Sequence, residues 1–395
     1  MKNINNCLAA KMILIGLVVM FAASPTPAIP PDPDNAALLY YQGFLSLAEL
    51  DDQARDHIAE VARGEAAPDD KVRQDISKCK GAIDFAEAAD EALYCSWGVR
   101  YSQGFECLLP QMAQARYLTF VLIADARLRA SDGDYKGALE RCLMTCNFAR
   151  HIGDDTAISY LVSLSVRTLS YKCMREIIGQ AAGDEELLKW FRDELVTSSG
   201  DSLSVVRPLK IEIELVTDLM QMENIEKLIR ILTDSNLGIL TDTNQKKVSW
   251  IAKAINEKIL ERARRIYSER MNSGLVVLST PMPYEAADAQ LKKLSDNFDP
   301  NNPSEALAGT FLPSFTKIYS QDTMRRTSLN ATIAAIDICL SRIKTGKLPD
   351  KLPADLPKDL FSGKDFDYEK NNDSFVLRCP GRDSDIYKFE FKVKK

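Results

Sequence analysis

Apolar side chains recur every three to four positions along most of the chain before Gly346. Residues at this spacing share one face of an α-helix, so the pattern predicts a body of packed amphipathic helices. The predicted helices cover residues 36–64, from 70 to beyond 83, several antiparallel segments within 110–179, and then 184–197, 202–234, 244–272 and 311–345.

Two expectations concern the first hundred residues. The apolar stripe of the first predicted helix, which we expect to face the core, consists of Leu38, Tyr41, Leu45 and Ala48. The segment 95–104 lacks a helical period. We expect the rings of Trp97 and Tyr101 to hold this segment against the body as an ordered loop.

The pattern changes after Gly346, where strands replace helices. Prolines at positions 349, 353 and 357 prevent further helix. The segments 374–378 and 387–393 are rich in apolar and aromatic residues, and the second alternates cleanly with polar ones. They predict a small antiparallel sheet with a turn at 370–373. The predicted fold class is mainly α: an antiparallel helical-hairpin body with a small C-terminal antiparallel β module.

The chain divides into four predicted parts. Residues 1–28 have the pattern of a signal peptide, and residues 29–280 form the α-helical body. Residues 281–310 contain four prolines and are expected to form an irregular linker or a pair of short helices. Residues 311–395 contain the last long helix and the sheet.

The first part indicates export. Lys2 and Lys11 precede an apolar run over residues 12–23, and small residues and prolines follow, as in a secretory signal. We expect cleavage near residues 24–29 and a periplasmic or extracellular protein. The alternative is an uncleaved inner-membrane anchor over residues 8–23, which would be the membrane contact of the protein. The apolar run is short for this role, because a spanning helix needs about 20 residues.

Charge and cysteine content narrow the class of protein. A formal net charge of −6 argues against a nucleic-acid binder, because neutralising phosphates requires a basic surface. Eight cysteines follow the signal segment, and an even number in an exported chain permits disulfides. Cys79, Cys95 and Cys107 are the candidates for a bridge, and buried thiols without bridges are the alternative.

Two partial resemblances concern the body and the chain as a whole. The turn Gly133-Asp134-Tyr135 leads into a helix with Ala138 and Ala149. This arrangement resembles a tetratricopeptide-type hairpin, without the repetition of about 34 residues along the chain. The start at 33–37, the Trp97-Gly98 loop and the tail are similar to secreted helical proteins of planctomycete-type bacteria. These likenesses imply a helical-hairpin protein with a protein partner and no particular activity.

Three motifs of the tail occur in a fixed order. Gly346-Lys347-Leu348-Pro349 follows the long helix, the stretch 359–368 ends in an aromatic segment, and Gly381-Arg382-Asp383 comes late. This order resembles the C-terminal module of type II secretion pseudopilins over roughly residues 311–385. The chain departs from that family at Leu360, where the family has proline, and in its charged helix, which carries Arg325 and Arg326.

The pseudopilin resemblance implies a long helix packed on the small sheet. An isolated hairpin is marginal in water, so the sheet needs this cover. The side chains expected to meet are Ile333, Ile336 and Leu340 of the helix and Phe366, Phe375, Leu377 and Phe389 of the sheet. We expect Lys370, Asn371 and Asn372 to be exposed in the turn.

The sequence carries little sign of catalysis. With two histidines, His57 and His151, it forms neither a three-histidine zinc site nor a His-Glu-x-x-His motif. His57 with Glu60, and His151 with Asp155, stand about one helical turn apart, a spacing that chance often produces. We interpret them as solvated or core-edge residues.

Other motifs of chemistry are equally weak. The sequence contains no nucleophile elbow, phosphate-binding loop or dinucleotide fingerprint. Cys142 and Cys146 share one helical face, but a redox pair uses the closer Cys-x-x-Cys spacing at a helix N-terminus, so we expect both to be buried.

Three functions follow as hypotheses. The first is a non-catalytic envelope protein whose helical body binds or scaffolds a partner. The second is a hydrolase or another enzyme with a site assembled from distant residues, in a pocket around Trp97, Tyr101 and His151. The third is an accessory component of a secretion or pilus-like assembly, which the tail alone motivates. Polar groups that converge in one concave site would favour the second hypothesis.

The pseudopilin resemblance also implies a calcium site, with Asp383 and Asp385 as oxygen ligands. The alternative is a solvent-facing, aspartate-rich turn. If calcium binds here, adding the ion raises the melting temperature of the protein and Asp383→Ala removes the rise. Differential scanning fluorimetry measures both effects. A melting temperature that does not respond to calcium would refute calcium binding at this site and leave the fold prediction unaffected.

Overall fold

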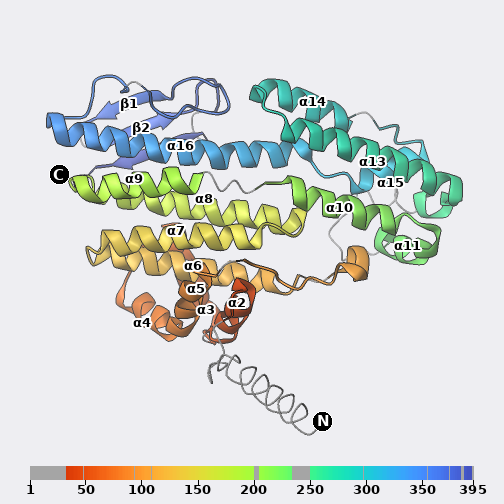
Figure 1. Ribbon diagram of the computed structural model, residues 1–395, viewed down its shortest axis with the longest axis horizontal. Helices are drawn as coiled ribbons and strands as arrows, with labels where there is room; N and C mark the ends of the chain where they lie inside the picture. The colour runs from red at the N-terminus through yellow and green to blue at the C-terminus, as the bar shows by residue number, and fades with distance from the viewer. Residues whose placement is uncertain are drawn as a thin grey trace, which may run out of the picture. The chain divides into compact units, whose positions relative to one another are not determined.

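The computed structural model describes residues 33–393, except positions 48, 93, 108, 200–203, 234–249, 297, 354, 373 and 384–386. Within this part of the chain, helices dominate and a three-stranded sheet lies near the C-terminus (Figure 1). The predicted fold class, mainly α with a small antiparallel β module, is confirmed. The predicted signal peptide over 1–28 and the alternative anchor over 8–23 lie outside the described residues.

The helical prediction before Gly346 is confirmed for the described residues, with changed boundaries. Two 3-10 helices, η1 (Tyr101–Glu106) and η2 (Met222–Asn224), lie in the connections. The α-helices are, in chain order, α2 (Ala36–Leu45), α3 (Asp52–Arg63), α4 (Asp70–Lys78), α5 (Lys80–Asp90), α6 (Gln111–Ser131), α7 (Tyr135–Ile152), α8 (Ala157–Gln180), α9 (Glu185–Ser199), α10 (Val206–Leu219), α11 (Ile225–Thr233), α13 (Glu257–Ser279), α14 (Tyr284–Asp296), α15 (Pro303–Phe311) and α16 (Phe315–Thr345).

Capping residues explain where several helices begin and end. The predicted helix over 36–64 is broken, because Asp51 starts α3 by accepting a hydrogen bond from the main-chain N–H of Ala54 (2.8 Å). Gly64 ends α3 in a left-handed conformation (φ 73°), which glycine adopts without strain. Asp134 starts α7 in the same way as Asp51 starts α3, by accepting from the N–H of Gly137 (2.9 Å).

The predicted apolar stripe of the first helix is wrong at two of its four positions; Tyr41 is half-buried against the core, and Ala48 lies outside the described residues. Leu38 and Leu45 are 50% and 87% exposed, whereas Tyr40 is buried. Nearly every position of α2 is apolar, so its sequence does not determine which face turns inward. Contact with α5 and with the ring of Trp97, whose centroid is 5.6 Å from that of Tyr40, selects the buried face.

Two apolar clusters form the core. The first cluster contains the buried faces of α2 to α9, the C-terminal part of α16 and the sheet. The second cluster contains those of α10, α11, α13, α14 and α15, together with the starts of α8 and α16. The helices α6, α7 and α8 are connected by short turns and form the middle of the first cluster (Figure 1).

Residues 281–310 are mostly helical rather than an irregular linker. They contain α14 and most of α15. Ala287 and Leu291 of α14, with Leu307 and Ala308 of α15, are buried in the second cluster. Both helices therefore belong to the packed body.

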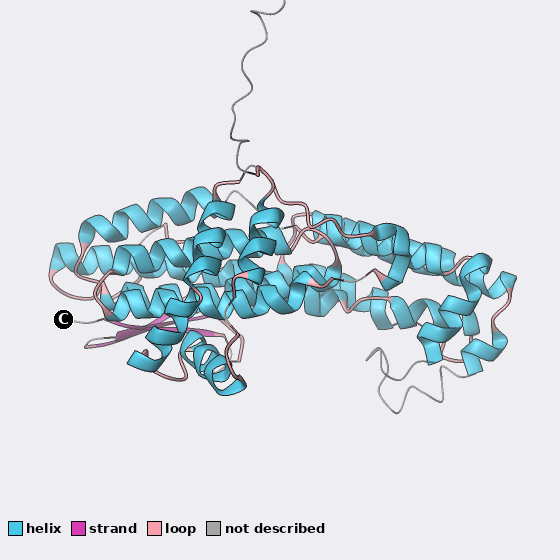
Figure 2. Ribbon diagram, turned by 90° about the horizontal axis from the view of Figure 1, so that it is seen from below, coloured by secondary structure: helices cyan, strands magenta, loops and turns pink. Residues whose placement is uncertain are grey.

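The strands β1 (Asp367–Asn371), β2 (Ser374–Arg378) and β3 (Lys388–Lys392) form an antiparallel sheet in that order. Among the described residues, pairing outside this sheet is confined to one isolated bridge between Asn35 and Tyr94. The strands lie side by side against the helices in Figure 2. As expected, Phe366, Phe375, Leu377 and Phe389 are buried, while Lys370, Asn371 and Asn372 are exposed. Phe391 of β3, which the prediction omits, is buried as well.

The sheet is covered by α8 as well as by the predicted α16. Ile333 and Ile336 of α16 are buried in the same cluster as the sheet. On the side of α8, Gly179 lies directly against β3: a methyl group at this position would overlap the carbonyl oxygen of Lys392. The pseudopilin-like expectation of a single covering helix therefore omitted the second one.

Replacing Gly179 with alanine tests the contact between α8 and β3. We expect Gly179→Ala to lower the free energy of unfolding by about 1–3 kcal/mol, because β3 must shift to admit the methyl group. Gly183→Ala is the matched control, since no atom lies within 4 Å of the added methyl group there. Urea denaturation measures both variants. Equal midpoints for the two variants would contradict the contact.

Candidate functional site

The predicted calcium ligands are only partly described. Asp385 lies outside the described residues. Asp383 is exposed, and its main-chain carbonyl accepts a hydrogen bond from the N–H of Tyr387 (2.9 Å). Within the described ranges, no group of three or more His, Cys, Asp or Glu side chains is placed to hold a metal ion. Calcium binding therefore stays a prediction.

The two histidines lie in different surroundings. His57 is at the surface, with its Nε2 3.1 Å from Asp69 Oδ2 and its Nδ1 3.8 Å from Glu60. His151 is buried in α7, and its Nδ1 is 3.0 Å from the hydroxyl of Tyr40. Burial, followed by the charge of Arg150, lowers the pKa of His151 to about 4.

Of the three residues around which a pocket is expected, Trp97 and His151 are buried and Tyr101 is half-buried, and hydrogen bonds hold them to their neighbours. Trp97 Nε1 donates to the main-chain oxygen of His151 (2.6 Å), and the Tyr101 hydroxyl donates to Asp155 (2.8 Å). The loop is thus held against the body, as predicted. None of the three residues lines the best-formed cavity among the described residues, which lies between α7, α8, α9, α13 and α16.

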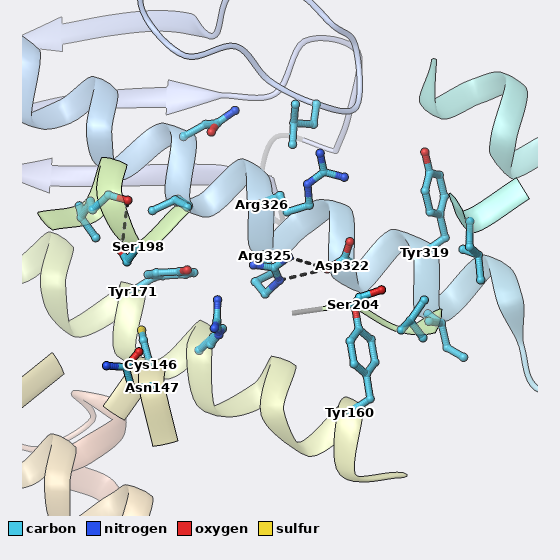
Figure 3. A pocket seen from close by; sticks show the side chains of 18 of the residues that line it. Cys146, Asn147, Tyr160, Tyr171, Ser198, Ser204, Tyr319, Asp322, Arg325 and Arg326 are labelled. Atoms are coloured by element: carbon cyan, nitrogen blue, oxygen red, sulfur yellow. Dashed lines mark hydrogen bonds and ion pairs between the residues drawn. The ribbon is translucent and has the colours of Figure 1, made fainter. Parts of the chain in front are cut away.

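That cavity has a volume of about 540 Å³ and lies where the two apolar clusters meet. Its walls come from α7, α8, α9, the start of α10, α13 and α16 (Figure 3). The polar side chains that line it are Cys146, Asn147, Tyr160, Arg167, Tyr171, Glu194, Ser198, Ser204, Tyr319, Asp322, Arg325, Arg326 and Asn330.

An ion pair on α16 faces this cavity. Arg325 donates to Asp322 Oδ1 from Nε (3.0 Å) and from Nη2 (2.8 Å). The side chain of Arg325 is buried, which lowers its pKa, and the attraction to Asp322 more than offsets this effect and raises the pKa. Tyr160 of α8 points toward this pair in Figure 3.

Arg167 lacks such a partner. The residue is 6% exposed, and its Nε is buried without a hydrogen-bond partner among the described residues. None of the ion pairs formed in the described part of the chain includes Arg167. Tyr160, two turns earlier on α8, is 1% exposed, and its hydroxyl is also buried without a partner. The Nε of Arg167 and the hydroxyl of Tyr160, two donors on one helix, therefore make no hydrogen bond of normal geometry, although Tyr171 lies beside Arg167 and Asp322 lies beside Tyr160.

The thiol of Cys146 lines the same cavity from α7. Burial raises its pKa, and the opposing charge of Arg167 does not reverse this effect. The thiol is therefore a poor nucleophile at neutral pH. None of the eight described cysteines forms a disulfide, so the structure agrees with the alternative of unbridged thiols at Cys79, Cys95 and Cys107.

Sequence reasoning missed the cavity, although one signal for it exists. Tyr160, Arg167 and Tyr171 stand at positions i, i+7 and i+11, on the same face of α8 as the buried Leu164. An arginine on the apolar face of a helix is unusual, because arginine is rarely buried without a partner. This position therefore marks Arg167 as a candidate functional residue.

No protein-family model, curated protein or solved structure matches this chain. The likenesses to tetratricopeptide hairpins, to pseudopilins and to secreted planctomycete-type proteins therefore rest on short sequence motifs. No helix among the described residues has an apolar stretch long enough to cross a membrane.

The buried His151 predicts a pH dependence of stability. The unfolded chain, with a histidine pKa near 6.5, takes up a proton before the folded chain, whose pKa is about 4. Stability therefore falls as the pH drops from about 6.5 to 4. We expect the loss to be about 3 kcal/mol larger in the wild type than in His151→Gln. Urea denaturation across this pH range measures it, and parallel curves for the two proteins would contradict the assignment.

Proposed function

We propose that this protein is a non-catalytic binding protein that takes a small organic molecule into the cavity between α8, α9 and α16. The observation that carries the proposal is the convergence of polar side chains on this cavity, where Arg167 Nε and the Tyr160 hydroxyl are buried without a hydrogen bond. Buried polar groups normally find a partner, and a ligand supplies one here.

The size and lining of the cavity support a small-molecule ligand. Pockets for such ligands usually have volumes of about 300–1,000 Å³ and combine apolar walls with a few oriented polar groups. This cavity, of about 540 Å³, has Val205, Leu278 and Ile318 among its apolar walls. The polar groups come from several helices, so they are held in position by the fold.

The chemistry of the lining supports binding rather than catalysis. A hydrolase needs a nucleophile with an adjacent base, or a general acid and base with matched pKa values. The residues that line the cavity include no histidine, and the pKa of the Cys146 thiol is raised. Asp322 is occupied by Arg325. Export of the chain and a protein partner stay predictions alongside this function.

Blocking the cavity tests the proposal. Ser198 and Thr197 are neighbours on α9 and both are exposed, but Ser198 lines the cavity and Thr197 does not. Ser198→Trp places an indole in the cavity, and Thr197→Trp is the matched control. We screen small organic acids, amides, alcohols and amines by thermal shift. We expect at least one compound to stabilise the wild type and Thr197→Trp but not Ser198→Trp, by about 2.7 kcal/mol at 100 times its Kd.

Two outcomes would contradict the function. In the first, no compound stabilises the wild type. In the second, every stabilising compound acts equally on Ser198→Trp and Thr197→Trp, which would place binding outside the cavity.

A further inference from the structure

The buried part of the cavity carries an excess positive charge. Arg167 and Arg325 are both at least nine-tenths buried, and Asp322 is the carboxylate that pairs with one of them. Glu194 and Arg326 also line the cavity, but both are exposed and their charges cancel. The net charge of the buried groups is therefore +1, and it belongs to the guanidinium of Arg167.

An uncompensated guanidinium in this position cannot neutralise itself. A buried cation without a partner is strongly unfavourable, and the usual escape is loss of the proton. Arginine does not lose its proton in proteins, because its pKa is too high. The charge of Arg167 therefore persists and requires an anion from outside the chain or a neighbour that ionises.

The neighbours of Arg167 do not ionise. The phenol of Tyr171 interacts with Arg167, but burial raises the pKa of that phenol. The Cys146 thiol, which also feels the charge of Arg167, has a raised pKa because of burial. Both groups are neutral at physiological pH, so they solvate the guanidinium without balancing its charge.

We propose that the ligand of this cavity is an organic anion whose carboxylate or phosphate group pairs with Arg167. This inference rests on the proposed function, since it assigns the chemical class of the same ligand. The guanidinium favours planar or tetrahedral oxyanions, which accept from two of its N–H groups at once. The body of the ligand lies among the apolar walls, within reach of the Tyr160 hydroxyl, which donates to or accepts from a second polar group.

Position along α8 sets the spacing of the two groups. Tyr160 and Arg167 are seven residues apart, and each helical residue rises 1.5 Å, so their backbones are about 10 Å apart along the axis. A ligand that reaches both is longer than a bare inorganic ion. The cavity therefore suits a small organic acid or an organic phosphate ester better than free phosphate.

Calorimetry with matched probes tests the class of ligand. Phenylacetate and phenyl phosphate are the anions, and phenylacetamide is the uncharged counterpart of the first. The titrations use a Tris chloride buffer at constant ionic strength, so that general screening is equal. We expect at least one anion to bind the wild type, phenylacetamide to bind at least tenfold more weakly, and Arg167→Met to bind the anion at least tenfold more weakly than the wild type.

The stability of variants without any probe provides an independent test. Arg167→Met removes an unpaired charge, so we expect its melting temperature to equal or exceed that of the wild type. Arg325→Met leaves Asp322 without its partner, so its melting temperature should fall. A fall for Arg167→Met as large as that for Arg325→Met would overturn the inference, because Arg167 would then have an internal partner.

Glu194 is the acidic group that could act as such a partner from the rim. We expect Glu194→Gln to bind the anion within twofold of the wild type and to keep its melting temperature. The inference is overturned if Glu194→Gln destabilises the wild type but not Arg167→Met, or if neither anion binds. If phenylacetamide binds as tightly as the anions, and Ser198→Trp blocks this binding while Thr197→Trp permits it, the cavity binds small molecules as proposed. The inference that its ligand is an anion would then be refuted.

Discussion

The packing of α8 against α16 is the contact on which both parts of the structure depend. Near the end of α8, the two helices meet, and Arg175 Nη1 donates to Ser328 Oγ (2.7 Å). The guanidinium of Arg175 also covers the ring of Phe389, 5.2 Å from its centroid, which holds β3 in place. Nearer the start of α8, large polar side chains stand between the same two helices and leave the cavity. The same helix pair therefore packs tightly in the first cluster, near the end of α8, and lines the cavity nearer the start of α8.

The cavity persists because its walls cannot collapse without burying more charge. Protein interiors are normally packed to the density of organic crystals, so a space of this size requires a cause. Here the ion pair of Asp322 and Arg325 faces the space from α16, and Arg167 faces it from α8. A third wall is fixed by α9, where Arg192 Nε donates to Asp337 of α16 (2.6 Å). Rigid helices and charged side chains together maintain the space.

The sequence predicts the helices and the sheet well, because each element carries its own period. It does not predict the inner face of α2, where Leu38 and Leu45 look suited to the core, since that choice depends on what packs against the helix. The cavity is even harder to predict from the sequence than the inner face of α2. Arg167 and Asp322 come from helices that are distant in the sequence, and a charged residue on an amphipathic helix is ordinarily exposed. No local spacing relates the two.

The position of the cavity between two apolar clusters has a consequence for the dynamics of the chain. Tyr319 is the partly buried ring that packs against both clusters, and its neighbours along this boundary are mainly polar. A polar boundary contributes little to cooperativity, so each cluster can open as its own foldon, with its own rate of hydrogen exchange. A molecule bound at the boundary contacts both foldons. Occupancy then joins two separate opening events into one, and both halves of the chain become protected together.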